Sequence, residues 1–200
     1  MTELGVRVGE VIETSTSRFV AHCYELHGAP ALGSLVRTGG IDRPVFGLVA
    51  AVSTTGIDPG RRPVARGQRE NDPEEIFKKN PQLAQLFRTE FEAIIVGHAD
   101  GGTIRQGLPP APPRVHDFVY LCRPEETASF TDQLHFLALI LEQPISVPAD
   151  ELIAAALRQA AASRPDPDEF LIRAGRELAR LLAPDPVRLQ LLLRRLKRDG

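Results

Sequence analysis

The sequence predicts an α+β fold, with a β-rich first part and a helical last part, from two patterns. Up to about residue 121, β-branched and aromatic segments alternate with glycine and serine turns at roughly 8–12-residue spacing, which is typical of small β proteins. From Pro124 onwards, apolar residues recur at the spacing of one helix face. We therefore expect a β domain over residues 1–125, with a short helical insert around 73–88, and a helical region over 126–200.

The strands are expected where apolar segments lie between turns. In chain order these segments are residues 6–12, 19–21, 35–36, 45–52, 91–99, 103–106 and 115–121. Gly9 and Gly47 fall inside two of them, and interior glycines fit the sharp bends of a small barrel, where a side chain would crowd the neighbouring strand. The pattern is that of a small barrel or a sandwich, and a six-stranded antiparallel β-barrel is the expected fold.

The residues of the helical insert predict where its first helix begins and where it ends. Asp72 can cap the helix, Pro73 suits the first helical position, and Glu75 completes a capping box. Asn80 precedes Pro81, and a residue before proline is pushed out of the helical region. We expect two short helices on either side of this pair.

The C-terminal region predicts four helices separated by prolines, over residues 132–141, 150–162, 168–182 and 187–196. The last is apolar around much of its circumference, which calls for two neighbours. One neighbour is the preceding helix, and the other is a second copy, a different protein or the rest of the helical bundle. The leucines that would form this partner-helix surface are Leu189, Leu192, Leu193 and Leu196.

Several function classes are disfavoured by composition. A P-loop needs a lysine followed by serine or threonine, and none of the three lysines, Lys78, Lys79 and Lys197, has that neighbour. The apolar runs are far shorter than the roughly 20 residues of a membrane span. With two cysteines and no basic segment followed by an apolar core at the start, the expected location is the cytoplasm.

Metal and catalytic chemistry are also not indicated. The chain has five histidines but no Cys-x-x-Cys pair, and His22 and Cys23 would point to opposite faces of a strand. We expect no metal, no cofactor and no catalytic residue, and an enzyme with an unrecognised site is the alternative.

Basic residues supply the candidate binding sites. Arg61, Arg62, Arg66 and Arg69 fall within nine residues and could meet phosphates or an acidic partner, although a solvated loop is the simpler interpretation. Arg194 and Arg195 near the C-terminus could touch nucleic acid or simply complement the helix dipole. With a net charge of −2, the chain is not a strong autonomous DNA binder.

The first 130 residues resemble a known domain in an ordered set of segments. These are residues 8–12 (VGEVI), 31–37 (ALGSLVR), 45–49 (VFGLV), 91–97 (FEAIIVG), the proline run 109–113 and residues 119–121 (VYL) followed by two glutamates. The set resembles the HAS-barrel, the N-terminal domain of HerA-type DNA-translocating ATPases, which is related to the N-terminal barrels of ATP synthase subunits. In that family the barrel leads into a P-loop ATPase domain, which is replaced here by about 70 residues of predicted helix.

The resemblance implies a non-enzymatic assembly or docking module. In HerA-type enzymes the barrel helps to hold a hexameric ring together and docks partners such as the NurA nuclease. We therefore expect an accessory subunit of a HerA/FtsK-type ATPase or nuclease in DNA processing, itself a homo-oligomer. The alternative is a small-barrel protein that binds nucleic acid through the basic loop.

Overall fold

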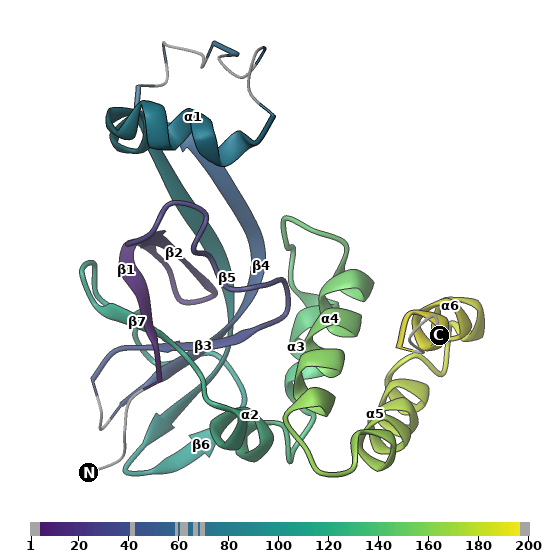
Figure 1. The fold of residues 1–200 in the computed structure, drawn as a ribbon. Helices are drawn as coiled ribbons and strands as arrows, with labels where there is room; N and C mark the ends of the chain where they lie inside the picture. The colour runs from purple at the N-terminus through teal and green to yellow at the C-terminus, as the bar shows by residue number, and fades with distance from the viewer. Residues whose placement is uncertain are drawn as a thin grey trace.

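The computed structural model describes residues 5–40, 43–58, 60, 64–65, 68 and 71–196 (Figure 1). Its strands and helices are, in chain order, β1 (Arg7–Thr14), β2 (Arg18–Cys23), β3 (Leu35–Thr38), β4 (Val45–Gly56), α1 (Pro73–Lys79), the 3-10 helix η1 (Pro81–Leu86), β5 (Phe87–Asp100), β6 (Thr103–Arg105), β7 (Phe118–Leu121), α2 (Pro124–Phe130), α3 (Phe136–Glu142), α4 (Ala149–Ala162), α5 (Pro167–Leu181) and α6 (Pro186–Leu196). The α+β class and the helical C-terminal region are confirmed, and α2 is a described helix in addition to the four that the sequence predicts there.

All the strands of the described part belong to one antiparallel sheet in the order β2-β1-β7-β3-β4-β5-β6. An additional pairing joins β2 to β5, with Arg18 opposite Ile94 and His22 opposite Glu90, so the sheet returns on itself in a barrel-like shape. It contains seven strands within the described residues, one more than expected. The seventh is the short β6, which pairs only with the end of β5 through the Asp100–Thr103 turn.

The inner side of the sheet holds its own apolar cluster. Its buried members are Val11, Phe19, Ala21, Cys23, Val36, Val45, Val49, Phe91, Ala93, Ile95 and Val119. The crowding expected at the two interior glycines is present. A Cβ on Gly9 would overlap the carbonyl oxygen of His22, and one on Gly47 would lie 3.0 Å from the ring of Phe19.

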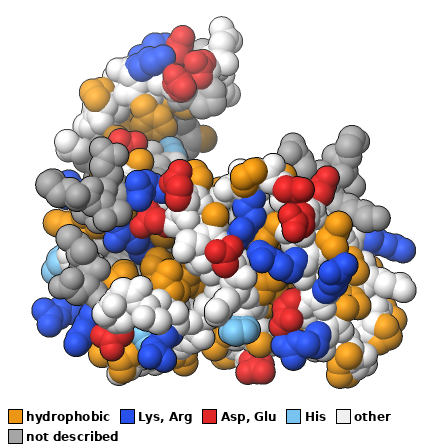
Figure 2. Space-filling view, turned by 90° about the horizontal axis from the view of Figure 1, so that it is seen from below, with side chains coloured by type: hydrophobic (Ala, Val, Ile, Leu, Met, Phe, Trp, Pro, Cys, Tyr) orange, Lys and Arg blue, Asp and Glu red, His pale blue; other side chains and the backbone are white. Residues whose placement is uncertain are grey.

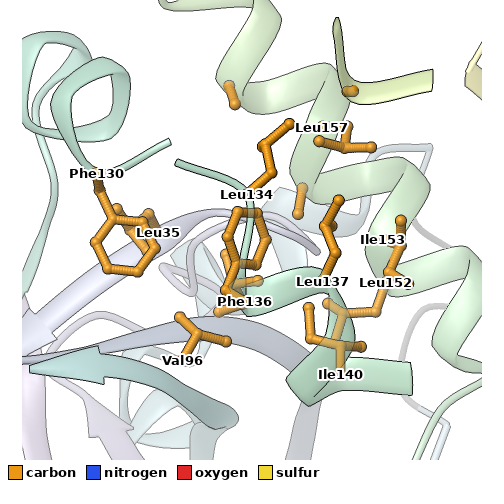
Figure 3. Packing of buried hydrophobic residues seen from close by; sticks show 14 of the residues in the cluster. Leu35, Val96, Phe130, Leu134, Phe136, Leu137, Ile140, Leu152, Ile153 and Leu157 are labelled. Atoms are coloured by element: carbon orange, nitrogen blue, oxygen red, sulfur yellow. The ribbon is translucent and has the colours of Figure 1, made fainter. Parts of the chain in front are cut away.

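A second cluster lies between the outer side of β3, β4 and β5 and the helices (Figure 3). Alternation along a strand sends Ile95 inwards and Ile94 and Val96 outwards, so both sides of β5 are apolar. Phe130 from α2 packs between Phe46 and Phe136, with ring centroids 5.1 and 5.8 Å away. The outer side of the sheet and the C-terminal helices therefore share one core, which is separate from the inner cluster.

The helical insert lies at the end of a long β4–β5 hairpin, which rises past the rest of the sheet (Figure 1). The Asp72 side chain accepts a hydrogen bond from the Glu74 amide at 2.9 Å, and α1 ends before Asn80, where η1 begins. The predicted cap and break are confirmed. The strands run further than predicted, since Gly56 pairs with Phe87 at the far end of the hairpin.

The last strand is shorter than predicted. Residues 115–117 form a turn instead, because His116 adopts a left-handed conformation with φ of 70°. The Arg114 amide donates to the Asp117 carboxylate at 2.8 Å, which closes this turn.

In the part of the chain that the structure describes, no helix is both long enough and apolar enough to cross a membrane.

Candidate docking surface

The helices cover only one side of the barrel-like sheet and leave another side open. The outer cluster draws its sheet residues from β3, β4 and β5, while β1 and β2 lie on the far side from α3–α6 (Figure 1). On this open side Tyr24 is 49% exposed and Phe118 is 45% exposed. We call the group formed by Arg7, Glu10, Tyr24, His116 and Phe118 the β1–β2–β7 face.

The register of the strands brings these residues together from distant parts of the chain. Glu10 lies opposite His22 on β2 and opposite Phe118 on β7. Tyr24 follows β2 directly, and its amide donates to the Val8 carbonyl at 3.2 Å. Alternation in β2 turns Phe19, Ala21 and Cys23 inwards, which leaves the side chains between and after them on the outer side.

Arg7 lies between two exposed aromatic rings. Its guanidinium carbon is 5.2 Å from the ring centroid of Tyr24 and 4.8 Å from that of Phe118. An arginine over an aromatic face is attracted by the ring quadrupole, with about 0.5–1 kcal/mol at an exposed site. The two contacts restrict a side chain that is otherwise long and flexible.

Glu10 is the acidic centre of the face. Its carboxylate lies 3.0 Å from His116 Nδ1 and accepts a hydrogen bond from the Tyr24 hydroxyl at 3.3 Å. The hydrogen bond with His116 lowers the pKa of Glu10. Desolvation and the nearby Glu10 carboxylate raise the pKa of Tyr24. Around neutral pH the face therefore combines a charged carboxylate with a charged guanidinium and two aromatic rings.

The sequence did not single out these residues. Glu10 and His116 are 106 positions apart, and only the antiparallel pairing of β1 with β7 brings them together. The signal available in the sequence was an aromatic residue directly after a strand of alternating residues, as at Tyr24. That signal is weak because single exposed apolar residues are common on protein surfaces.

The four arginines of the predicted basic loop, Arg61, Arg62, Arg66 and Arg69, lie outside the described residues. Near the C-terminus, Arg194 and Arg195 are both exposed, and Arg195 also joins α6 to α4 through an ion pair with Glu151 at 2.7 Å.

The four leucines of the predicted partner-helix surface lie against the chain's own core. Leu192 is fully buried, Leu196 is 5% exposed, and Leu189 and Leu193 pack on the same cluster between α4, α5 and α6. This placement agrees with the alternative stated above, in which the rest of the helical bundle covers these leucines. The apolar side chains that α6 does expose are Val187 and Leu191.

A groove of about 500 Å³ lies between the α2–α3 connection and α5. Its lining includes Glu177, which accepts a hydrogen bond from Arg180 at 2.6 Å, and Asp132, which pairs with Arg164 at 3.0 Å. The bond from Arg180 lowers the pKa of Glu177, the opposite of what a general acid near neutral pH requires. Basic and acidic side chains are interleaved over the face seen in Figure 2 rather than gathered by sign.

Within the described ranges, no three histidine, cysteine or acidic side chains are grouped so as to hold a metal ion. Both cysteines are buried. Desolvation raises the pKa of the Cys23 thiol to about 11 and also raises that of Cys122. Neither thiol is therefore activated as a nucleophile.

Compared with known proteins, the chain matches no protein-family model and no curated protein.

Proposed function

We propose that this protein is a non-enzymatic docking module that binds a protein partner through the β1–β2–β7 face. The partner we propose is a HerA/FtsK-type ATPase or a nuclease of DNA processing in the cytoplasm, as the HAS-barrel resemblance implies. In this proposal β1, β2, β5, β4, β3 and β7 form the six-stranded barrel, and β6 is an extension of one strand.

The observation that carries the proposal is Arg7 held between the exposed rings of Tyr24 and Phe118. Tyrosine and arginine are among the residue types that dominate binding energy at protein interfaces, and aromatic residues in general are enriched there. Arg7 and Phe118 project from paired strands, and the Tyr24 backbone directly after β2 is bonded to Val8 of β1, so little ordering is needed on binding. The carboxylate of Glu10 beside them adds a site for a cation from the partner.

The experiment is recovery of companions from the native cell with the tagged full-length protein, followed by mass spectrometry. Wild type is compared with Phe118→Ala and Arg7→Ala. The matched control is Ile172→Ala, which removes another exposed apolar side chain, 58% exposed, on α5. Circular dichroism checks that each variant folds.

The proposal predicts a DNA-processing ATPase or nuclease with wild type and with the control. Truncating a hot-spot residue costs about 2 kcal/mol or more, and we expect Arg7 and Phe118 to be hot spots, so each face variant should recover at least about tenfold less of it. Equal recovery by all the variants would remove the face from the proposal. Recovery of metabolic enzymes alone would remove the proposed partner class.

A further inference from the structure

Within the described residues, the outer edge of β4 has no neighbouring strand over its second half. β3 pairs with β4 only from Val45 to Leu48, and the last backbone bonds on that side join Ser34 and Gly33 to Val49. β4 then continues to Gly56 with β5 on its other side. Residues 52–55 are exposed.

The register shows which backbone groups face this edge. The Ile57 amide donates to the Leu86 carbonyl at 3.0 Å, and the pairing runs without a shift back to Ala51 opposite Glu92. In an antiparallel ladder the hydrogen-bonded positions alternate, so residues 51, 53 and 55 bond to β5. The amides and carbonyls of Val52, Thr54 and Gly56 therefore point away from β5, to the open edge.

This edge lacks the features that usually block edge-to-edge pairing. Natural edges carry lysines, prolines or bulges. Val52, Ser53, Thr54, Thr55 and Gly56 include no charge and no proline, and the bulge in β4 lies earlier, between Val49 and Ala51.

We propose that residues 52–56 of β4 pair with the same segment of a second copy of this chain, antiparallel about a twofold axis at Thr54. Val52 then lies opposite Gly56 of the second copy, Ser53 opposite Thr55, and Thr54 opposite itself. The outward groups make about six ladder hydrogen bonds in this register.

The segment's own chemistry favours a second copy as the occupant. Every opposed pair is uncharged, so self-pairing meets no like-charge repulsion, and cross-strand serine–threonine and threonine–threonine pairs are favourable. On β5 behind the edge, Arg88 and Glu90 neutralise each other in an ion pair at 3.0 Å. The hairpin that carries this edge rises past the rest of the sheet (Figure 1).

The first test changes one backbone donor. In Thr54→Pro the lost amide faces the open edge and not β5, so the ladder within the chain keeps its bonds. Thr54→Val is the matched control, since it also loses the 2.9 Å hydrogen bond between the Thr54 and Thr89 hydroxyls but keeps the amide. Sedimentation equilibrium between 1 and about 200 μM follows the mass of each, folding being checked by circular dichroism.

We expect wild type and Thr54→Val to reach twice the 21.9 kDa of one chain, and Thr54→Pro to raise the dimer dissociation constant at least tenfold. A monomer at all concentrations for wild type, or unchanged association of Thr54→Pro, would overturn the proposal.

The second test reads the register directly and does not depend on proline. Ser53 and Thr55 of the two copies would face each other with Cα atoms about 4.5 Å apart, within disulfide range. A mixture of Ser53→Cys and Thr55→Cys should cross-link under mild oxidation. Either variant alone should not, because its own two Cα atoms would be roughly 8 Å apart. Cross-linking of each variant alone at the same rate would exclude this register. The native cysteines are buried and should not interfere.

The dimer edge and the β1–β2–β7 face share no residue, so either proposal can fail alone. If Phe118→Ala loses the partner but still dimerises, the result supports the β1–β2–β7 face and leaves the dimer edge unaffected. If Thr54→Pro loses the dimer but keeps the partner, the result supports the dimer edge and leaves the face unaffected.

Discussion

Substitution of Gly33 by alanine should be severely destabilising, because this glycine lies directly against helix α4. Its φ is +79°, a conformation that costs an L-residue roughly 1–2 kcal/mol. A Cβ there would overlap the backbone nitrogen of Ala156 and lie 2.5 Å from the carbonyl carbon of Ala155. These are backbone atoms of a buried helix, so the chain cannot relieve the overlap by turning a side chain.

The magnitude follows from the two terms. Forcing a methyl group into a packed contact costs about 1–3 kcal/mol in addition to the backbone term. The free energy of unfolding should therefore fall by about 2–5 kcal/mol, a large share of the 5–15 kcal/mol that holds a typical domain. Gly101 is the matched control, since its φ is also positive, at 57°, but nothing lies within 4 Å of its Cβ position.

Urea unfolding followed by circular dichroism measures both variants. Gly101→Ala should lose only the backbone term, roughly 1–2 kcal/mol. The difference between the two variants reports the packing of the β2–β3 connection on α4. If Gly33→Ala were no less stable than Gly101→Ala, the inferred close contact between the sheet and the helices would be refuted.

Three further predictions follow from single contacts. Phe130→Ala should lower the free energy of unfolding by about 3–5 kcal/mol in the same urea assay, because the ring is fully buried between two others; a loss below about 1 kcal/mol would contradict the shared core. Cys23 and Cys122 should not react with Ellman's reagent at pH 8 until denaturant is added, and a prompt reaction of the native protein would contradict their burial. His116→Gly, which tolerates the positive φ, should raise the pKa of Glu10 towards its ordinary value in an NMR titration. Because the folded-state pKa of Glu10 is lowered, its contribution to stability is present above the ordinary glutamate pKa and is lost as the pH falls through the lowered value; an unchanged titration would contradict the His116 contact.

The local elements were predictable because their signals lie within a few residues. Asp72 and Pro73 specify the start of α1, and the Asn80–Pro81 pair specifies its end, whatever the rest of the chain does. Of the described helices after Pro124, α3 to α6 were visible in their apolar spacing, whereas α2 (Pro124–Phe130) was not among the expected helices.

The closure of the sheet was not visible locally. The pairing of Arg18 with Ile94 joins positions 76 residues apart, and no short pattern encodes it. The ends of the long hairpin were also missed, because Ser53, Thr54 and Thr55 resemble a polar loop until Arg88, Thr89 and Glu90 pair with them.

The candidate face was missed for the same reason. Arg7, Tyr24 and Phe118 are unremarkable one by one, and only the strand order β2-β1-β7 gathers them. The leucines of α6 were visible in the sequence, but their meaning was not. A helix that is apolar around its circumference must be covered, and the pattern does not say whether its own chain or a partner covers it. Leu192 and Leu196 are covered by the chain's own α4 and α5 cluster.

The docking role through the β1–β2–β7 face is tested most directly by a photo-reactive amino acid at position 118 of the protein in its native cell, with position 172 as the control. Both side chains are exposed, Phe118 on β7 and Ile172 on α5. We predict that illumination joins position 118, and not position 172, to a DNA-processing ATPase or nuclease. Equal adducts from both positions, or none from position 118, would contradict the assignment of this face.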